Sequence, residues 1–174
     1  DGQHFADATG NGSLTIDGVT VIETGLDREI WEYDRYYRPE LWLDNDRLVI
    51  SSNYYRYSND YGIFTLSTGE VTWMNLGKMN GNGLSGIRLL DGKLFWTVMN
   101  ENFFTDDESG SVSEMAFYSL PVEELPYGTP TRMATKLYYG MEHNGRLWTA
   151  ETNYTATGHL TVLAFDPESG ESAE

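Results

Sequence analysis

The chain has 174 residues, of which 40% are hydrophobic and 14% aromatic, and it contains 18 glycines but no cysteine. This composition argues against intrinsic disorder and excludes a disulfide framework and thiolate chemistry. The formal net charge of -16 repels phosphate backbones and anionic membranes, and no apolar run reaches the ~20 residues of a membrane span. We therefore expect no nucleic-acid binding and no membrane insertion.

The basic side chains include only three lysines, a balance that is typical of exported and salt-adapted proteins with a carboxylate-rich surface. We therefore expect an extracellular or cell-surface location. The many aromatic residues and turn-forming glycines favour strands over helices, and the sequence predicts an all-β protein.

The first segment with strand character covers residues 12–25, where apolar and polar residues alternate on both sides of Asp17-Gly18. This segment matches the later stretch 64–73, which has the pattern of a third and a fourth strand of a repeated unit. The sequence therefore predicts a partial unit here, without its first two strands.

Three later segments share one pattern, which begins with an apolar strand, a tight turn, a basic residue and a leucine. The turns are Asp44-Asn45-Asp46, Asp91-Gly92 and Asn144-Gly145. Asp-Gly and Asn-Gly between apolar runs are strong hairpin signals, because a type I′ turn needs positive φ at both central residues. Each segment therefore opens with a predicted hairpin.

A glycine near the start of the third strand marks the repeat: Gly62, Gly110 and Gly158 lie 48 residues apart. A fourth strand is predicted at 71–74 in the first copy and at 131–134 in the second. The third copy has no counterpart before the sequence ends. The predicted four-stranded units cover about 40–76, 85–135 and 137–171, the last lacking its outer strand.

Units of four short strands that repeat every ~40 to 50 residues are typical of β-propeller blades. We therefore interpret residues 1–174 as one domain, an incomplete β-propeller, with a β-sandwich or barrel as the alternative architecture. Three and a half blades leave open edges, so we expect either that the natural protein is longer or that a homo-oligomer or a second chain completes the ring. The predicted core residues are Leu41, Phe64, Ile87, Leu94, Trp96, Phe117, Trp148 and Phe165.

The second strands of two copies carry Leu94-Phe95-Trp96-Thr97 and Leu147-Trp148-Thr149. In these motifs and in its repeat pattern, the chain resembles secreted bacterial propellers of the YWTD-like and kelch-like groups. The resemblance covers roughly residues 12–171. It implies a fold and a binding habit, and it implies no chemistry.

The loops between second and third strands lie on one face of a propeller, which is the usual site of ligand contact. In this chain they combine aromatic rings with carboxylates and amides, a mixture suited to sugars or extended peptides. Features present in every copy favour a scaffold role, so the unshared residues are the stronger candidates: Tyr55, Arg56, Phe104 and the run from Asp106 to Glu108. The candidate ligand-binding residues are Tyr54, Tyr55, Arg56, Tyr57, Asn102, Phe103, Phe104, Asp106, Asp107, Asn153 and Tyr154.

Sequence signals for catalysis or for a bound metal are weak. The acidic runs 44–46 and 106–108 lack the spacing of a calcium loop, and the three histidines lack metal-ligand spacing, so we expect no cofactor and no metal. Gly83-Leu84-Ser85-Gly86 is one residue short of a nucleophile elbow.

The sequence thus favours a non-catalytic binding module for a protein or a carbohydrate. One alternative is a glycan-active enzyme with Glu101 and Glu151 as distant carboxylates, or a propeller segment that gates a catalytic domain. Another alternative is a structural part of a larger assembly.

Overall fold

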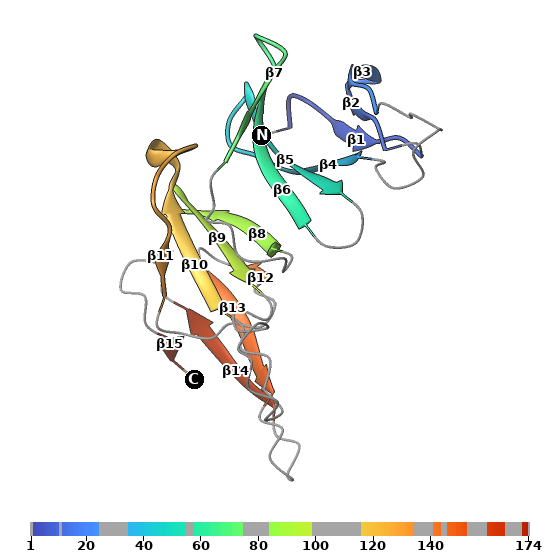
Figure 1. The fold of residues 1–174 in the computed structure, drawn as a ribbon. Coiled ribbons are helices and arrows are strands. Elements are labelled where there is room, and N and C mark those ends of the chain that lie inside the picture. Colours follow the sequence, from blue (N-terminus) through green and yellow to red (C-terminus); the bar gives the residue numbers. More distant parts are fainter. Residues whose placement is uncertain are drawn as a thin grey trace, which may run out of the picture. The chain divides into compact units, whose positions relative to one another are not determined.

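The computed structural model describes residues 2–10, 12–24, 35–54, 58–74, 84–98, 116–133, 141–143, 146–152, 160–165 and 172–173. Within these ranges the fold is all-β, with fifteen strands in antiparallel sheets and one 3₁₀ turn, Val122–Glu124 (Figure 1). The all-β prediction is confirmed. The chain divides into two compact units, residues 1–83 with 125–128 and residues 84–124 with 129–174.

The N-terminal sheet of the first unit has the order β1-β2-β3, with β1 at Ala6–Ala8, β2 at Leu14–Ile16 and β3 at Val19–Ile22. Asp17 and Gly18 connect β2 to β3 with φ values of +51° and +80°, as a type I′ turn requires. The sequence predicted only two strands here. The extra strand β1 has the sequence Ala-Asp-Ala, which is too short and too small to show an apolar period.

The second sheet contains β4 (Arg35–Trp42), β5 (Arg47–Tyr54), β6 (Ser58–Thr65) and β7 (Glu70–Trp73), paired in chain order. Strand β4 begins before the predicted boundary near residue 40. The pairing of β4 with β5 is irregular between Pro39 and Leu41. Proline has no N–H to donate to a sheet, and a bulge accommodates it, so the strand continues on both sides of Pro39.

A common core joins the N-terminal sheet to the second sheet. Leu14 and Ile16 of β2 form one buried cluster with Leu48 and Ile50 of β5 and Phe64 of β6. All five are at most 3% exposed, and full burial of such a side chain contributes on the order of 2 kcal/mol. One face of each sheet therefore packs against the other sheet.

The second unit contains the remaining sheets. The third sheet has the order β11-β10-β9-β8, formed by β8 (Leu84–Leu90), β9 (Lys93–Val98), β10 (Ala116–Pro121) and β11 (Thr131–Arg132). Leu94 to Thr97 of β9 are all buried, so both faces of this central strand are covered. Trp96 stacks on the directly opposite Tyr118 of β10, with 6.1 Å between ring centroids.

The fourth sheet contains β12 (Met141–His143), β13 (Arg146–Thr152), β14 (Leu160–Phe165) and β15 (Ser172–Ala173), in that order. The sequence predicted no outer strand for this unit, and the prediction is wrong, because Ser172 pairs with Phe165 and Ala173 with Ala164. A strand of two small residues has no apolar period that the sequence could reveal.

Burial agrees with most of the predicted core. Phe64, Ile87, Leu94 and Trp96 are buried, whereas Leu41 is half-buried. Trp148 is 36% exposed in β13, so its prediction as a core residue is wrong. An indole is large enough to remain partly exposed while most of the ring packs. The side chains of Phe117 and Phe165 lie outside the described part of the structure.

Candidate functional site

The predicted ligand-binding loops connect the second and third strands of the three four-stranded sheets. Tyr54 is the last residue of β5, where it pairs with Arg35 of β4 and Ser58 of β6. The backbone therefore places it at the base of the β5–β6 connection. The other candidates lie outside the described residues: Tyr55, Arg56, Tyr57, Asn102, Phe103, Phe104, Asp106, Asp107, Asn153 and Tyr154.

The two carboxylates of the alternative enzymatic hypothesis are not placed together by the structure. Glu151 lies in β13, opposite Thr161 of β14, and Glu101 falls outside the described residues. The acidic run 106–108 also falls outside them.

The acidic turn between β4 and β5 is a hydrogen-bonded structural element. The Asp44 carboxylate accepts hydrogen bonds from the backbone amides of Asp46 and Arg47 at 2.9 and 2.8 Å, and from Arg47 Nε at 2.7 Å. Asp46 accepts hydrogen bonds from Ser67 N at 2.7 Å and from Ser67 Oγ at 2.9 Å. The Asp44 carboxylate thus closes the turn, and the Asp46 carboxylate connects the turn to Ser67, which follows β6.

The electrostatics of Asp44 agree with this structural role. Desolvation raises the pKa of Asp44, but the hydrogen bonds from Asp46 and Arg47 together with the Arg47 charge outweigh it, so the net pKa lies below its usual value. In the part of the chain that the structure describes, no three acidic, histidine or cysteine side chains are grouped as metal ligands would be.

The two faces of the N-terminal sheet differ in chemistry. Leu14 and Ile16 point into the core, and the alternation along β2 places Ser13 and Thr15 on the opposite face. Thr15 pairs with Asp7 of β1 and with Thr20 of β3, so these side chains share the opposite face. We call it the polar face.

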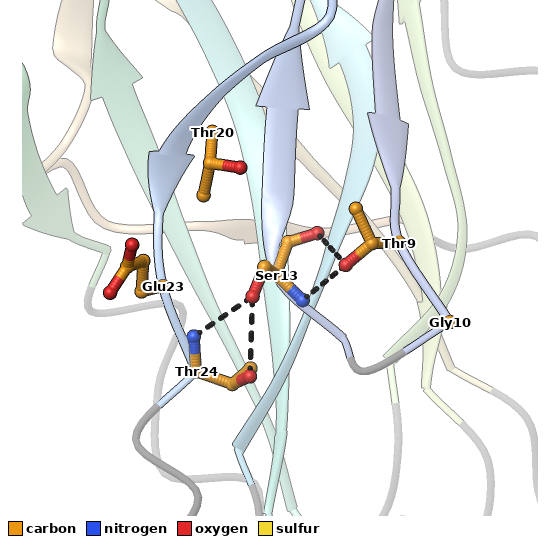
Figure 2. Close-up of a pocket in the computed structure, with 6 residues that line it drawn as sticks. All are labelled: Thr9, Gly10, Ser13, Thr20, Glu23 and Thr24. Carbon is orange, nitrogen blue, oxygen red and sulfur yellow. Dashed lines mark hydrogen bonds between the residues drawn. The ribbon is translucent and has the colours of Figure 1, made fainter.

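A hollow that is open to solvent lies at one end of the N-terminal sheet and has a volume of about 510 Å³. It is lined by Thr9, Gly10, Ser13, Thr20, Glu23 and Thr24, and we call it the hydroxyl hollow. Figure 2 shows Thr20, Glu23 and Thr24 along one segment, with Ser13 between that segment and Thr9. Of these six described residues, four carry a hydroxyl and Glu23 carries a carboxylate.

Hydrogen bonds connect three of the residues that line the hydroxyl hollow. Ser13 is only 4% exposed, and its Oγ accepts a hydrogen bond from Thr24 N at 3.1 Å and lies 3.3 Å from Thr24 Oγ1. Thr9 Oγ1 accepts a hydrogen bond from Ser13 N at 3.1 Å and lies 3.2 Å from Ser13 O. These bonds hold the ends of β1, β2 and β3 together around Ser13.

A second polar cluster holds the start of β1. The Asp17 carboxylate accepts a hydrogen bond from Phe5 N at 2.9 Å and lies 2.7 Å from His4 Nδ1. Asp17 N in turn donates to Phe5 O at 2.8 Å. The His4 ring lies 5.7 Å from the Trp42 ring between centroids, so this cluster also contacts the second sheet.

Sequence reasoning did not identify the hydroxyl hollow as a site. Serine and threonine that alternate with Leu14 and Ile16 are also what an ordinary solvent-facing strand would carry. The hollow depends on Thr9, which precedes β2, and on Thr24, which follows β3. No local motif shows that these residues meet.

None of the helical structure in the described residues is long and apolar enough to cross a membrane. Comparison with models of protein families, with curated proteins and with solved structures found no match to this chain.

Proposed function

We propose that the chain is part of a β-propeller and that it acts as a non-catalytic binding module, exported from the cell, for a protein or carbohydrate ligand. The observation that carries the proposal is the repetition of one sheet. Three sheets each contain four antiparallel strands paired in chain order, which is the arrangement of a propeller blade. The resemblance in sequence to secreted bacterial propellers supports the same architecture and the exported location.

The packing of the N-terminal sheet on the second sheet also supports a propeller. Blades pack face to face through apolar side chains, and the cluster around Leu14, Ile50 and Phe64 joins two successive sheets in this way. A barrel would instead need strand pairing to continue from one sheet to the next. The described strands form four separate hydrogen-bonded sheets.

The binding role follows from the chemistry of the loops. The three connections after β5, β9 and β13 occupy equivalent positions in their sheets, and they contain the aromatic, amide and acidic residues predicted to contact a ligand. Aromatic rings stack on sugar rings and cover extended peptides, while amides and carboxylates fix their orientation.

Glycan and protein arrays probed with the intact chain test this function, followed by binding measurements on Tyr55→Ala and Phe104→Ala. We expect each variant to weaken binding at least tenfold, because an aromatic hot-spot residue typically contributes ~2 kcal/mol or more and ~1.4 kcal/mol is tenfold. Tyr127→Ala is the matched control, since Tyr127 is an aromatic residue that is 77% exposed and lies outside these loops.

Two outcomes would overturn the proposal. Unchanged binding in both loop variants would show that these loops do not form the ligand site. Turnover of chromogenic glycosides that disappears in Glu101→Gln or Glu151→Gln would instead identify an enzyme.

A further inference from the structure

The polar face of the N-terminal sheet is chemically unsuited to packing against another sheet. Asp7 and Thr20 are exposed on it, and Thr15 is half-buried. A sheet packed on this face would have to desolvate a carboxylate and several hydroxyls without gaining apolar burial. In β5 of the second sheet, by contrast, Val49 and Ile50 on opposite faces are both fully buried. The described part of the N-terminal sheet therefore has one apolar face in the core and one polar face.

The hydroxyl hollow has the size of a small-molecule site. Its volume of about 510 Å³ falls within the ~300 to 1,000 Å³ that ligand pockets usually occupy. Ser13 lies almost completely buried in it, and the hydrogen bonds to Thr9 and Thr24 fix its position. A polar wall that is held in this way presents a defined pattern of groups to a ligand.

The lining determines which ligand chemistry fits. Among the described residues, the lining consists of hydroxyls, one carboxylate and a glycine, with no basic and no aromatic side chain. An anionic ligand would be repelled by Glu23 and by the net charge of -16, and an apolar ligand would leave the hydroxyls unsolvated. Calcium takes six to eight oxygen ligands. The described lining offers one carboxylate among its hydroxyls, which is too few charged oxygens for a calcium site.

A neutral, hydroxyl-rich molecule meets these conditions. Adjacent hydroxyls of a sugar ring can donate to both oxygens of the exposed Glu23 carboxylate, and such hydrogen bonds to a charged acceptor are stronger than neutral ones. The exposed Thr20 hydroxyl can donate to or accept from another ring hydroxyl. We propose that the hydroxyl hollow binds a neutral sugar of about one ring, with Glu23 and Thr20 as its principal contacts.

This site goes beyond the proposed function, because it lies on the N-terminal sheet and uses none of the loop residues assigned to ligand binding. The intact chain can test it by amide NMR during titration with glucose, mannose, galactose and N-acetylglucosamine. We expect at least one of the four to shift the resonances of Ser13, Thr20 and Glu23 with a measurable dissociation constant.

The variants Glu23→Gln and Thr20→Val test the proposed contacts of these two side chains with the sugar. We expect Glu23→Gln to raise the dissociation constant about tenfold, because it replaces a charged double acceptor by an amide. Thr20→Val, which keeps the shape and removes the hydroxyl, should raise it about threefold to tenfold. Glu70→Gln is the control, since Glu70 is an exposed glutamate in β7 of the second sheet and should leave the dissociation constant unchanged. Glucuronate, which adds a negative charge, should bind at least ten times more weakly than glucose.

Three results would contradict the proposal that the hydroxyl hollow binds a sugar. No shift at Ser13, Thr20 and Glu23 with any of the four sugars would leave it without a ligand. Shifts confined to residues 53–57 would support the proposed loop function and refute this one. Sedimentation that reveals a dimer, with the Thr20 and Glu23 resonances broadened by self-association, would show that a second copy covers the polar face.

Discussion

Gly62 of β6 and Trp73 of β7 lie directly opposite each other, and the indole occupies the space where a side chain at position 62 would project. A Cβ atom on Gly62 would lie 2.9 Å from Trp73 Cε3 and 2.9 Å from Val71 Cγ1. Glycine here allows an aromatic residue of the outer strand to cover the neighbouring backbone, a pairing known to stabilise glycine in sheets. Gly62 is the first of three glycines spaced by 48 residues, and the other two lie outside the described residues.

We predict that Gly62→Ala lowers the free energy of unfolding by about 1–3 kcal/mol, because the new methyl group must displace Trp73 or Val71. Urea denaturation followed by tryptophan fluorescence measures the change. Gly10→Ala is the control, since a Cβ atom there meets nothing within 4 Å and Gly10 does not have a positive φ. Equal stability of the two variants would contradict the crowding of Gly62 by Trp73.

Two adjacent serines of β5 allow a comparison of buried hydroxyls. Ser51 donates a hydrogen bond to Glu40 Oε1 at 2.6 Å, whereas the fully buried Ser52 Oγ has no hydrogen-bond partner in the described part of the chain. We predict that Ser51→Ala destabilises the chain by about 1–2 kcal/mol and that Ser52→Ala leaves it unchanged or stabilises it by up to about 1 kcal/mol. Comparing the urea midpoints of both variants with that of the unmodified chain tests this prediction. A clear loss of stability in Ser52→Ala would contradict it.

The cluster around Asp17 predicts a dependence of stability on pH. The backbone amide of Phe5, and after it His4, holds the pKa of Asp17 below the usual 3.8. Since the folded state lowers this pKa, the stabilising contribution is complete above about pH 4 and is lost as the pH falls through the lower, folded-state value. Asp17→Asn removes the charge but keeps a residue that tolerates the φ of +51°.

We expect Asp17→Asn to lower the urea midpoint at pH 7 and to differ less from the unmodified chain at pH 3. Asp91→Asn is the matched control, because Asp91 occupies the same position in the β8–β9 turn with a φ of +46°. A difference that stays constant between pH 7 and pH 3 would show that the Asp17 charge does not contribute.

Two of the three predicted hairpin turns lie in the described residues, and they could be predicted from the sequence because their chemistry is local; Asn144-Gly145 lies outside the described residues. Asp91-Gly92 joins β8 to β9 with positive φ at both residues, as its sequence indicated, and Asp44 to Asp46 turn the chain between β4 and β5. The positive φ values depend on the turn residues alone, since glycine and aspartate reach that region at low cost.

The short strands and the hydroxyl hollow could not be predicted, because they depend on partners far away in the chain. Strands β1 and β15 consist of small residues, and only pairing with β2 and β14 defines them. Of the loop site, the described part of the structure includes only Tyr54, at the end of β5. The remaining loop residues therefore stay a prediction from sequence.

The sequence by itself determined the all-β class and the turns at Asp17-Gly18 and Asp91-Gly92, because strand periodicity and turn conformation are properties of neighbouring residues. Only the tertiary structure decided which face of the N-terminal sheet is buried and where its hollow lies. The apolar cluster around Leu14 and Phe64 selects the buried face. The hydroxyl hollow depends on hydrogen bonds that Ser13 N donates to Thr9 and that Thr24 N donates to Ser13 Oγ. The buried face and the hollow both depend on contacts between strands. The free energy of such contacts cannot be inferred from any one segment of the sequence.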